Sequence, residues 1–241
     1  MSDTAVPAPF RWEDGHLALD LPGGHVLFTT RRGGVSEGPY ASLNLGSWTD
    51  DEPVRIAENR RRVQQRAGGR RLLQGRQVHG AHVASEQGEG EEADGQATAR
   101  GDAAPIVLVA DCLPIELVAP GAVAMVHAGW RGLAEGVIAA GVAAVRALAA
   151  DGATVAAAIG PGAGPCCYEV GDEVRAAFGD PSPPTRTLDM KAIAAGQLAA
   201  AGVDEVHDAG LCTMCADPVL FFSHRRDGGV TGRQAGLVWS S

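Results

Sequence analysis

Residues 106–126, IVLVADCLPIELVAPGAVAMV, decide the fold class. They contain three short apolar runs, 106–110, 115–118 and 122–126, separated only by Asp-Cys-Leu-Pro and Ala-Pro-Gly. Apolar runs of this length, bounded by turn residues, predict buried strands. Because parallel strands need a crossover of a dozen or more residues, these short connections favour antiparallel pairing. The segment predicts a mixed-sheet α/β sandwich over a doubly wound parallel sheet.

Helical and strand patterns alternate on both sides of this segment. Apolar residues from Leu133 to Leu148 recur on one helical face, and VAAAI (155–159) predicts a buried strand that runs into the turn GPGAGPCC. The remaining expected elements are a strand at 25–31, a helix from Asp51, helices around 171–178 and 189–201, and a terminal strand pair at 219–224 and 231–239.

The chain is predicted to form a single domain over residues 1–241, with residues 1–24 as an amino-terminal extension. Residues 85–104 contain acids and glycines but no large apolar side chain. We interpret them as an exposed acidic loop within the domain, because strong patterns resume on both sides.

Composition and charge restrict the function classes. The net charge of −9 disfavours a nucleic-acid partner, and the most apolar long stretch, 133–149, is too interrupted for a membrane span. The first residues show no signal-peptide pattern, and five cysteines fit thiol or metal chemistry in a reducing compartment. We therefore expect a cytoplasmic protein. Arginines crowd residues 55–71; they are interpreted as a solvated helix face, with a patch for a phosphorylated ligand as the alternative.

Three segments end a strand or turn with a soft metal ligand: His79 in GRQVHG, Cys112 after one predicted strand and His127 after a later one. If those strands are neighbours, the thiol and the imidazole emerge close together. Two histidines and one cysteine form a catalytic zinc set that leaves a fourth position open. Spacing alone leaves this hypothesis open, because a single histidine is commonly a hydrogen-bonded structural residue.

A rival set is local in the sequence. His207, Cys212 and Cys215 form H-x4-C-x-x-C, which has plausible zinc spacing, although a lone C-x-x-C is commonly two half-buried thiols. Cys166 and Cys167 are adjacent and cannot easily both bind one tetrahedral ion, so we interpret them as turn packing.

Nine segments of the chain, taken together and in order, form a distinctive pattern. The segments are FTTRRGGVSEGPYASLNLG (28–46), ENRRRV (58–63), QVHG (77–80), ADCLPI (110–115), VHAGWRGLAEGV (126–137), IGPGAGPCCYEVGDEV (159–174), CT (212–213), FFSHRRDG (221–228) and TGRQAG (231–236). With these segments the chain resembles the YfiH-like family, also called the polyphenol oxidase or laccase-domain family, the purine nucleoside phosphorylase family and the peptidoglycan editing factor. The resemblance covers roughly residues 25–239. The chain departs from the family pattern in its acidic loop at 88–102 and in Glu116, where an aliphatic residue is usual.

The resemblance implies a layered α/β/β/α sandwich similar to the catalytic domain of cytotoxic necrotizing factor. It implies zinc as the cofactor, held by His79, Cys112 and His127. The implied small-molecule partners are a purine nucleoside (adenosine, inosine or S-methyl-5′-thioadenosine) and phosphate, which react to give free base and ribose 1-phosphate. Adenosine deamination is implied as a further activity.

Polar residues within these segments are candidates for the remaining roles. For phosphorolysis, Arg131 and Arg226 are candidates to bind phosphate, and Ser42 and Asn44 to bind sugar hydroxyls. For deamination, Asp111 is the carboxylate that the sequence places beside the metal, as the acid that protonates the leaving ammonia.

Three alternatives belong to other classes. In a cysteine hydrolase that edits peptidoglycan precursors, Cys112 would be the nucleophile and His127 the base. A copper polyphenol oxidase would need many clustered histidines, whereas the chain has seven. A non-enzymatic module would bind a partner through the arginine segment.

Overall fold

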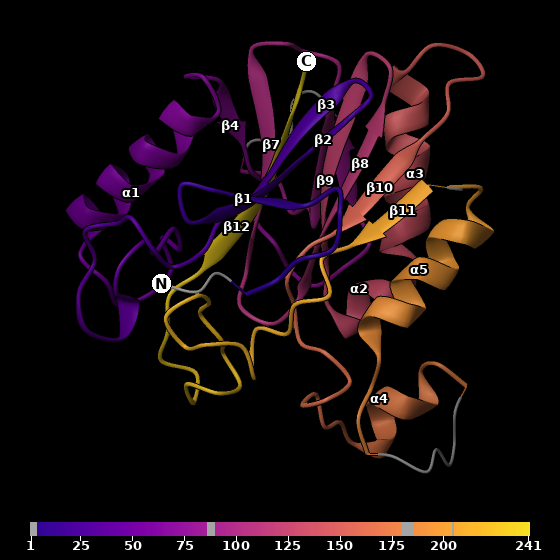
Figure 1. Cartoon of the computed structure of the whole chain (residues 1–241). Coiled ribbons are helices and arrows are strands. Elements are labelled where there is room, and N and C mark those ends of the chain that lie inside the picture. Colours follow the sequence, from indigo (N-terminus) through magenta and orange to yellow (C-terminus); the bar gives the residue numbers. More distant parts are fainter. Residues whose placement is uncertain (1–3, 86–89, 180–185, 204) are drawn as a thin grey trace.

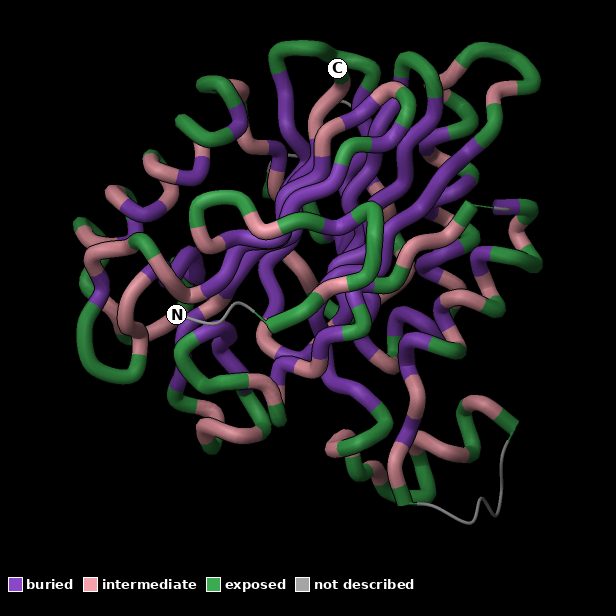
Figure 2. Tube along the Cα trace, viewed as in Figure 1, coloured by how far each residue is buried: buried purple, intermediate pink, exposed green. Residues whose placement is uncertain are grey.

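Two six-stranded sheets lie face to face at the centre of the computed structural model, and helices cover the outer face of each sheet (Figure 1). The structure describes residues 4–85, 90–179, 186–203 and 205–241. The strands of both sheets are buried for most of their length, while the exposed segments are mainly connections and outer helix faces (Figure 2). The layers are therefore α/β/β/α, as the resemblance implied.

The first sheet has the order β1-β2-β3-β12-β7-β4 and is antiparallel except for the β4–β7 pair. The last strand of the chain, β12, lies at its centre between β3 and β7. The strands are β1 (Arg11–Glu13), β2 (His16–Leu21), β3 (Gly24–Phe28), β4 (Arg71–Leu73), β7 (Ala103–Val109) and β12 (Gln234–Ser240).

The second sheet has the order β11-β10-β8-β9-β6-β5, with parallel pairs only at its two edges. The sheet is thus mixed, as expected from the short turns. Its strands are β5 (Val83–Ser85), β6 (Gly95–Thr98), β8 (Leu113–Ala119), β9 (Ala122–Ala128), β10 (Ala156–Ile159) and β11 (Glu205–Asp208).

Successive residues of the central strands face two different apolar layers. In β8, for example, Leu117 faces the helices and Val118 faces the other sheet. Because both faces are covered, the strands appear in the sequence as continuous apolar runs. The helices are α1 (Pro53–Arg66) on the first sheet, α2 (Trp130–Glu135), α3 (Val137–Leu148) and α5 (Met190–Ala200) on the second, and the short α4 (Asp172–Ala176); residues Gly38–Tyr40 form a 3-10 turn.

The sequence predicted most of these elements but not how they divide between sheets. The strand predicted at 106–110 is β7 of the first sheet, whereas 115–118 and 122–126 lie in β8 and β9 of the second. The helix predicted from Leu133 is confirmed but broken at Gly136, which has a φ of 90°. Residues 180–185, between the helices predicted around 171–178 and 189–201, lie outside the described residues, as do residues 86–89 of the predicted acidic loop.

Three expectations are corrected. Residues 85–104 are not one exposed loop, because β6 lies within them and pairs with β9. The segment 1–24 is not a simple extension, since β1 and β2 form an edge of the first sheet and bury Leu17 and Leu19. Residues 219–224 form no strand: the backbone of Phe222 hydrogen-bonds to the side chain of Gln234 in place of a ladder.

The arginines of α1 carry ion pairs at the surface, including Arg61 and Arg62 with Glu58, and Arg66 with Asp14. This arrangement fits the solvated helix face that the sequence suggested. Among the described residues, none of the helices has the length and apolar character needed to span a bilayer.

Candidate metal site and pocket

The side chains of His79, Cys112 and His127 converge, and their ligand atoms all lie within 4.8 Å of one another. The two imidazole rings meet edge to face, with centroids 4.9 Å apart and an interplanar angle of 76°. His127 is buried, Cys112 is half-buried and His79 is exposed. Two neutral nitrogen donors and one thiolate, with one side open, fit a thiophilic divalent ion that keeps a position for an exogenous ligand.

The chain reaches this arrangement by crossing between the sheets. Cys112 lies in the turn where the chain leaves β7 of the first sheet and enters β8 of the second. The antiparallel β8–β9 register places Pro114 opposite His127, so the turn before β8 lies beside the imidazole. The two ligands are therefore neighbours through β8, and not because the strands that precede them pair with each other.

Asp94 fixes both histidines. Its Oδ1 lies 2.7 Å from Nδ1 of His127 and accepts the backbone N–H of His79 at 2.9 Å. Its Oδ2 accepts the backbone N–H groups of Val78 and Gly80 at 3.0 and 2.8 Å. Since Nδ1 of His127 faces Asp94, Nε2 is directed to the site, and a carboxylate behind a ligating imidazole fixes its orientation.

The site is electrostatically coupled. Burial raises the pKa of the Cys112 thiol, but His127 and His79 outweigh this effect and lower it from 9.0 to about 6. Burial lowers the pKa of His127, but Cys112 and Asp94 reverse the effect and raise it from 6.5 to about 9. The pKa of Asp94 is lowered: burial opposes this, while His127 and the backbone N–H groups favour the carboxylate. The group thus stabilises a thiolate.

Two residues of the site have a left-handed backbone. His79 has a φ of 62° and Asp111 a φ of 96°, values that cost non-glycine residues energy. Gly129 closes the other side of the triad: a Cβ there would lie 3.1 Å from both Cys112 Sγ and His79 Cδ2. Close packing at Gly129 and a left-handed backbone at His79 therefore occur together at this group of three side chains.

A cavity of about 270 Å³ opens beside the three ligands. Among the residues that the structure describes, its wall carries more positive than negative groups, because Arg225 and Arg233 line it and Asp111 is the one carboxylate. The full set is Trp48, Gln77, His79, Leu108, Val109, Ala110, Asp111, Cys112, His127, Tyr168, His224, Arg225 and Arg233.

Residues 25–241 match the family model described as multi-copper polyphenol oxidoreductase laccase. The chain belongs to this laccase-domain, YfiH-like family. A purine nucleoside phosphorylase of Pseudomonas aeruginosa is 40% identical over 88% of this chain and 91% of the relative. A purine nucleoside phosphorylase of Streptomyces griseus is 39% identical over 89% and 94%.

Solved structures of the family superpose over nearly the whole chain. YlmD from Geobacillus stearothermophilus is 34% identical with a TM-score of 0.86, covering 97% of this chain and 99% of its own. YfiH from Bacillus licheniformis is 28% identical with a TM-score of 0.88, covering 98% and 100%.

Three of the predicted substrate residues make contacts within the chain. Asn44 is fully buried, and its Oδ1 accepts the backbone N–H of Arg233 at 2.9 Å. The hydroxyl of Ser42 donates to the Arg31 carbonyl and accepts the N–H of Gly34. The guanidinium of Arg226 is occupied by Asp227 and by the carbonyls of Thr213 and Phe221. These groups hold loops in place, and their contacts with sugar or phosphate stay predictions.

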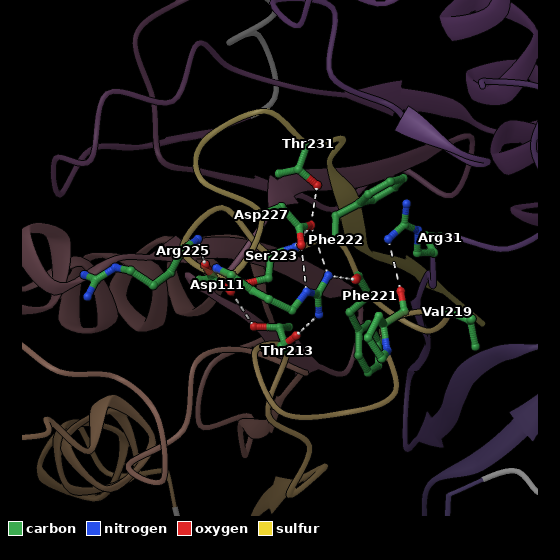
Figure 3. A network of polar contacts seen from close by, with 12 residues as sticks. Arg31, Asp111, Thr213, Val219, Phe221, Phe222, Ser223, Arg225, Asp227 and Thr231 are labelled. Carbon is green, nitrogen blue, oxygen red and sulfur yellow. Dashed lines mark hydrogen bonds and ion pairs between the residues drawn. The ribbon is translucent and has the colours of Figure 1, made fainter. Parts of the chain in front are cut away.

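Asp111 lines the cavity, but both of its oxygens are engaged. Oδ1 accepts the Thr213 hydroxyl at 2.7 Å, and Oδ2 accepts the backbone N–H of Arg225 at 2.8 Å (Figure 3). The bond from Arg225 anchors the 221–228 loop to the turn before β8, and the bond from Thr213 anchors the turn after β11 to it. Arg131 is exposed and stacks on the ring of Trp130 at 4.2 Å, outside the set that lines the cavity.

Sequence reasoning missed Asp94, Trp48, Gln77 and Tyr168. Asp94 was placed in the acidic loop, where nothing local distinguishes it from its acidic neighbours. Two late segments gave a signal for the cavity, because FFSHRRDG (221–228) contributes His224 and Arg225 to its lining and TGRQAG (231–236) contributes Arg233.

Proposed function

We propose that the protein is a zinc-dependent purine nucleoside phosphorylase that converts adenosine, inosine or S-methyl-5′-thioadenosine and phosphate to free base and the ribose 1-phosphate. The observation that carries the proposal is the junction of an open His-Cys-His ligand set with a cationic, partly aromatic cavity. The names of the relatives from Pseudomonas and Streptomyces point to the same reaction.

Arg233 is the leading residue for phosphate binding. It is half-buried and lines both the main cavity and a neighbouring hollow of about 130 Å³. Its Nη1 donates to the carbonyls of Thr231 and Gly232. In the described part of the chain, no carboxylate lies within ion-pair distance of it, so its charge is available to an anion. Arg225, which also lines the main cavity, is the second candidate.

The aromatic residues supply surfaces for the base. Trp48, 53% exposed, and the half-buried Tyr168 both line the cavity, and the guanidinium of Arg225 lies 5.3 Å from the Tyr168 ring centroid. Flat apolar faces that flank a polar pocket suit a purine ring. At about 270 Å³ the cavity is close to the small end of ligand pockets, roughly 300 Å³.

In phosphorolysis a phosphate oxygen bonds to C1′ while the C1′–N9 bond breaks, and the purine leaves with the electron pair and gains a proton. Arg233 and Arg225 would hold the phosphate and offset its charge as it approaches C1′. Zinc would be held by His79, Cys112 and His127, a soft donor set that hard ions such as Mg²⁺ disfavour. When bound, it supplies a positive centre that polarises an oxygen.

The test is an assay with adenosine or inosine in the presence and absence of phosphate. We expect free base and ribose 1-phosphate in equal amounts, and no base release when phosphate is omitted. Base released at the same rate without phosphate would make the protein a hydrolase and overturn the proposal.

A hydrolase is the second candidate, because His127 lies between Cys112 and Asp94. A thiol, an imidazole and an orienting carboxylate in this order are the parts of a cysteine nucleophile with its base, as in the predicted editing of peptidoglycan precursors. His79 argues for the metal reading, since a second imidazole beside the thiolate has no role in that arrangement.

The other predicted activities have less support. Deamination of adenosine stays a prediction. Asp111, the residue expected to protonate the leaving ammonia, has both carboxylate oxygens engaged in hydrogen bonds within the chain. A copper oxidase would need several histidines close together. The described residues contain two clusters of three or more potential metal ligands, and only one of these clusters includes histidines, namely two. That is too few for a multicopper centre. A cytoplasmic setting is part of the proposal, because five free cysteines suit a reducing compartment.

A further inference from the structure

Four cysteines from two distant parts of the sequence converge in a group of their own, separate from the set of His79, Cys112 and His127. Cys166 and Cys167 end the turn that follows β10, and Cys212 and Cys215 lie in the turn that follows β11. Because β10 and β11 are parallel neighbours, both turns leave the same edge of the sheet. A bridge between Gly162 and Cys212 continues the pairing beyond the strands.

The four sulfur atoms form one cluster. All of them lie within 4.8 Å of one another, and Sγ of Cys166 lies 3.4 Å from Sγ of Cys215. The sulfur atoms of a tetrahedral Zn–S₄ centre, with bonds of about 2.3 Å, lie roughly 3.8 Å apart. A disulfide needs about 2.05 Å, so this cluster has the spacing of a metal centre.

Backbone groups support a negative charge at the cluster. The N–H of Gly164 donates to Sγ of Cys212 at 3.3 Å, and the N–H groups of Met214 and Cys215 act on the same sulfur. Space is restricted there, because a Cβ on Gly164 would lie 3.3 Å from Cβ of Cys212. N–H groups directed at a thiolate stabilise it, as thiolate ligands require.

We propose that Cys166, Cys167, Cys212 and Cys215 bind a second zinc ion, in a closed structural site separate from the His79–Cys112–His127 set. Four protein ligands fill the tetrahedral coordination of zinc, so this site has no open position for substrate. The sequence had suggested His207 as the partner of Cys212 and Cys215. His207 instead contacts Glu205 within β11, and the adjacent pair Cys166-Cys167 takes its place.

This second site would stabilise one wall of the cavity. Tyr168, which lines the cavity, directly follows Cys167. Thr213, which lies between Cys212 and Cys215, donates its hydroxyl to Asp111. A zinc ion that joins the two turns would hold Tyr168 and the Thr213–Asp111 contact at a fixed separation.

Metal analysis of untagged protein, purified without chelator under reducing conditions, tests the proposal. We expect about two zinc ions per chain in the wild type. His79→Ala and Cys212→Ser should each retain about one, and in His79→Ala the zinc X-ray absorption spectrum should show sulfur ligands with no imidazole signal. One zinc in the wild type and none in His79→Ala would overturn the proposal.

A variant of the cluster that fails to fold would give no metal count, so a second measurement uses the wild-type chain. After zinc is exchanged for Co²⁺, a tetrathiolate site gives intense sulfur-to-metal charge-transfer bands, stronger than those of a site with one thiolate. We expect these bands to persist in His79→Ala. A mass spectrum that shows a disulfide among the four cysteines, in place of metal, would contradict the inference.

Discussion

Oδ1 of Asp94 lies 2.7 Å from Nδ1 of His127, and both side chains are almost completely buried. The same carboxylate accepts three backbone N–H groups from the segment that carries His79. Asp94 thus sets the distance between a ligand on β9 and a ligand on a loop. We expect Asp94 to act on metal binding through the orientation of His79 and His127.

Asp94→Asn keeps the shape of the side chain and removes its charge, so the histidines lose their orienting carboxylate. We expect the affinity for zinc at this site to fall about 10- to 100-fold, measured by competition with a chromophoric chelator. Asp102→Asn is the matched control, because Asp102 is exposed and pairs with Arg100 at the surface. Unchanged zinc affinity in Asp94→Asn would contradict the role of Asp94 in orienting the histidines.

Gly129→Ala tests how closely the site is packed. The added Cβ would lie 3.1 Å from Cys112 Sγ and from His79 Cδ2, closer than side chains normally approach. We expect weaker zinc binding and lower activity in a folded protein. Gly196→Ala on α5 is the control: it meets nothing within 4 Å and should stabilise the helix by about 1 kcal/mol. Equal activity in both variants would contradict the packing argument.

Arg233→Gln should raise the KM for phosphate about 10- to 100-fold, the value of one or two charge-assisted hydrogen bonds. Arg131→Gln should leave it unchanged, because Arg131 is exposed and stacks on Trp130 outside the cavity. Steady-state kinetics at varied phosphate, with melting temperatures to check folding, separate the two. A larger effect in Arg131→Gln would restore the sequence-based assignment.

Glu116 lies fully buried on β8, and neither carboxylate oxygen has a side-chain hydrogen-bond partner among the residues that the structure describes. Burial raises its pKa well above the usual 4.5, although the Ala158 backbone opposes the shift. The folded chain therefore keeps the proton, and the unfolded chain releases it from about pH 4.5 upward. Stability is full below that pH and falls by about 1.4 kcal/mol per pH unit above it.

Glu116→Leu should remove this pH dependence and stabilise the protein by about 1–3 kcal/mol at pH 7. Glu116→Gln should also remove the pH dependence, but it keeps a buried polar group, so its increase in stability at pH 7 should be smaller than that of Glu116→Leu. Urea unfolding at a series of pH values measures both slopes. A wild-type stability that does not fall between pH 5 and pH 7 would contradict the buried-acid interpretation.

The sequence predicted the apolar strands because each one is buried on both faces and appears as a continuous run. It missed β6, whose residues Gly95–Thr98 (GQAT) include no large apolar side chain. That strand pairs with β9 on one side and with β5 on the other. Such pairing depends on other segments of the chain and leaves no local pattern within β6.

The ligands were recognisable because His79, Cys112 and His127 stand in distinctive segments. The carboxylate of Asp94, which orients His127, was not recognisable, because it lies 33 residues from His127 in the sequence. Asn44 and Arg226 were assigned to substrate because they are polar and lie in the same segments. In the fold, backbone N–H and carbonyl groups satisfy them, and local sequence does not distinguish a polar group that binds the chain from one that binds a ligand.

The most direct test of the account asks whether Cys112 is a metal ligand or a free nucleophile. Active, zinc-loaded protein is treated with iodoacetamide, and the alkylation of Cys112 is followed by peptide mass spectrometry together with nucleoside phosphorolysis. A coordinated thiolate is protected, so we predict little labelling of Cys112 until a chelator removes the zinc, and rapid labelling afterwards. Rapid alkylation of Cys112 in the zinc-loaded enzyme, with activity lost in step, would contradict the metal site and favour the cysteine hydrolase.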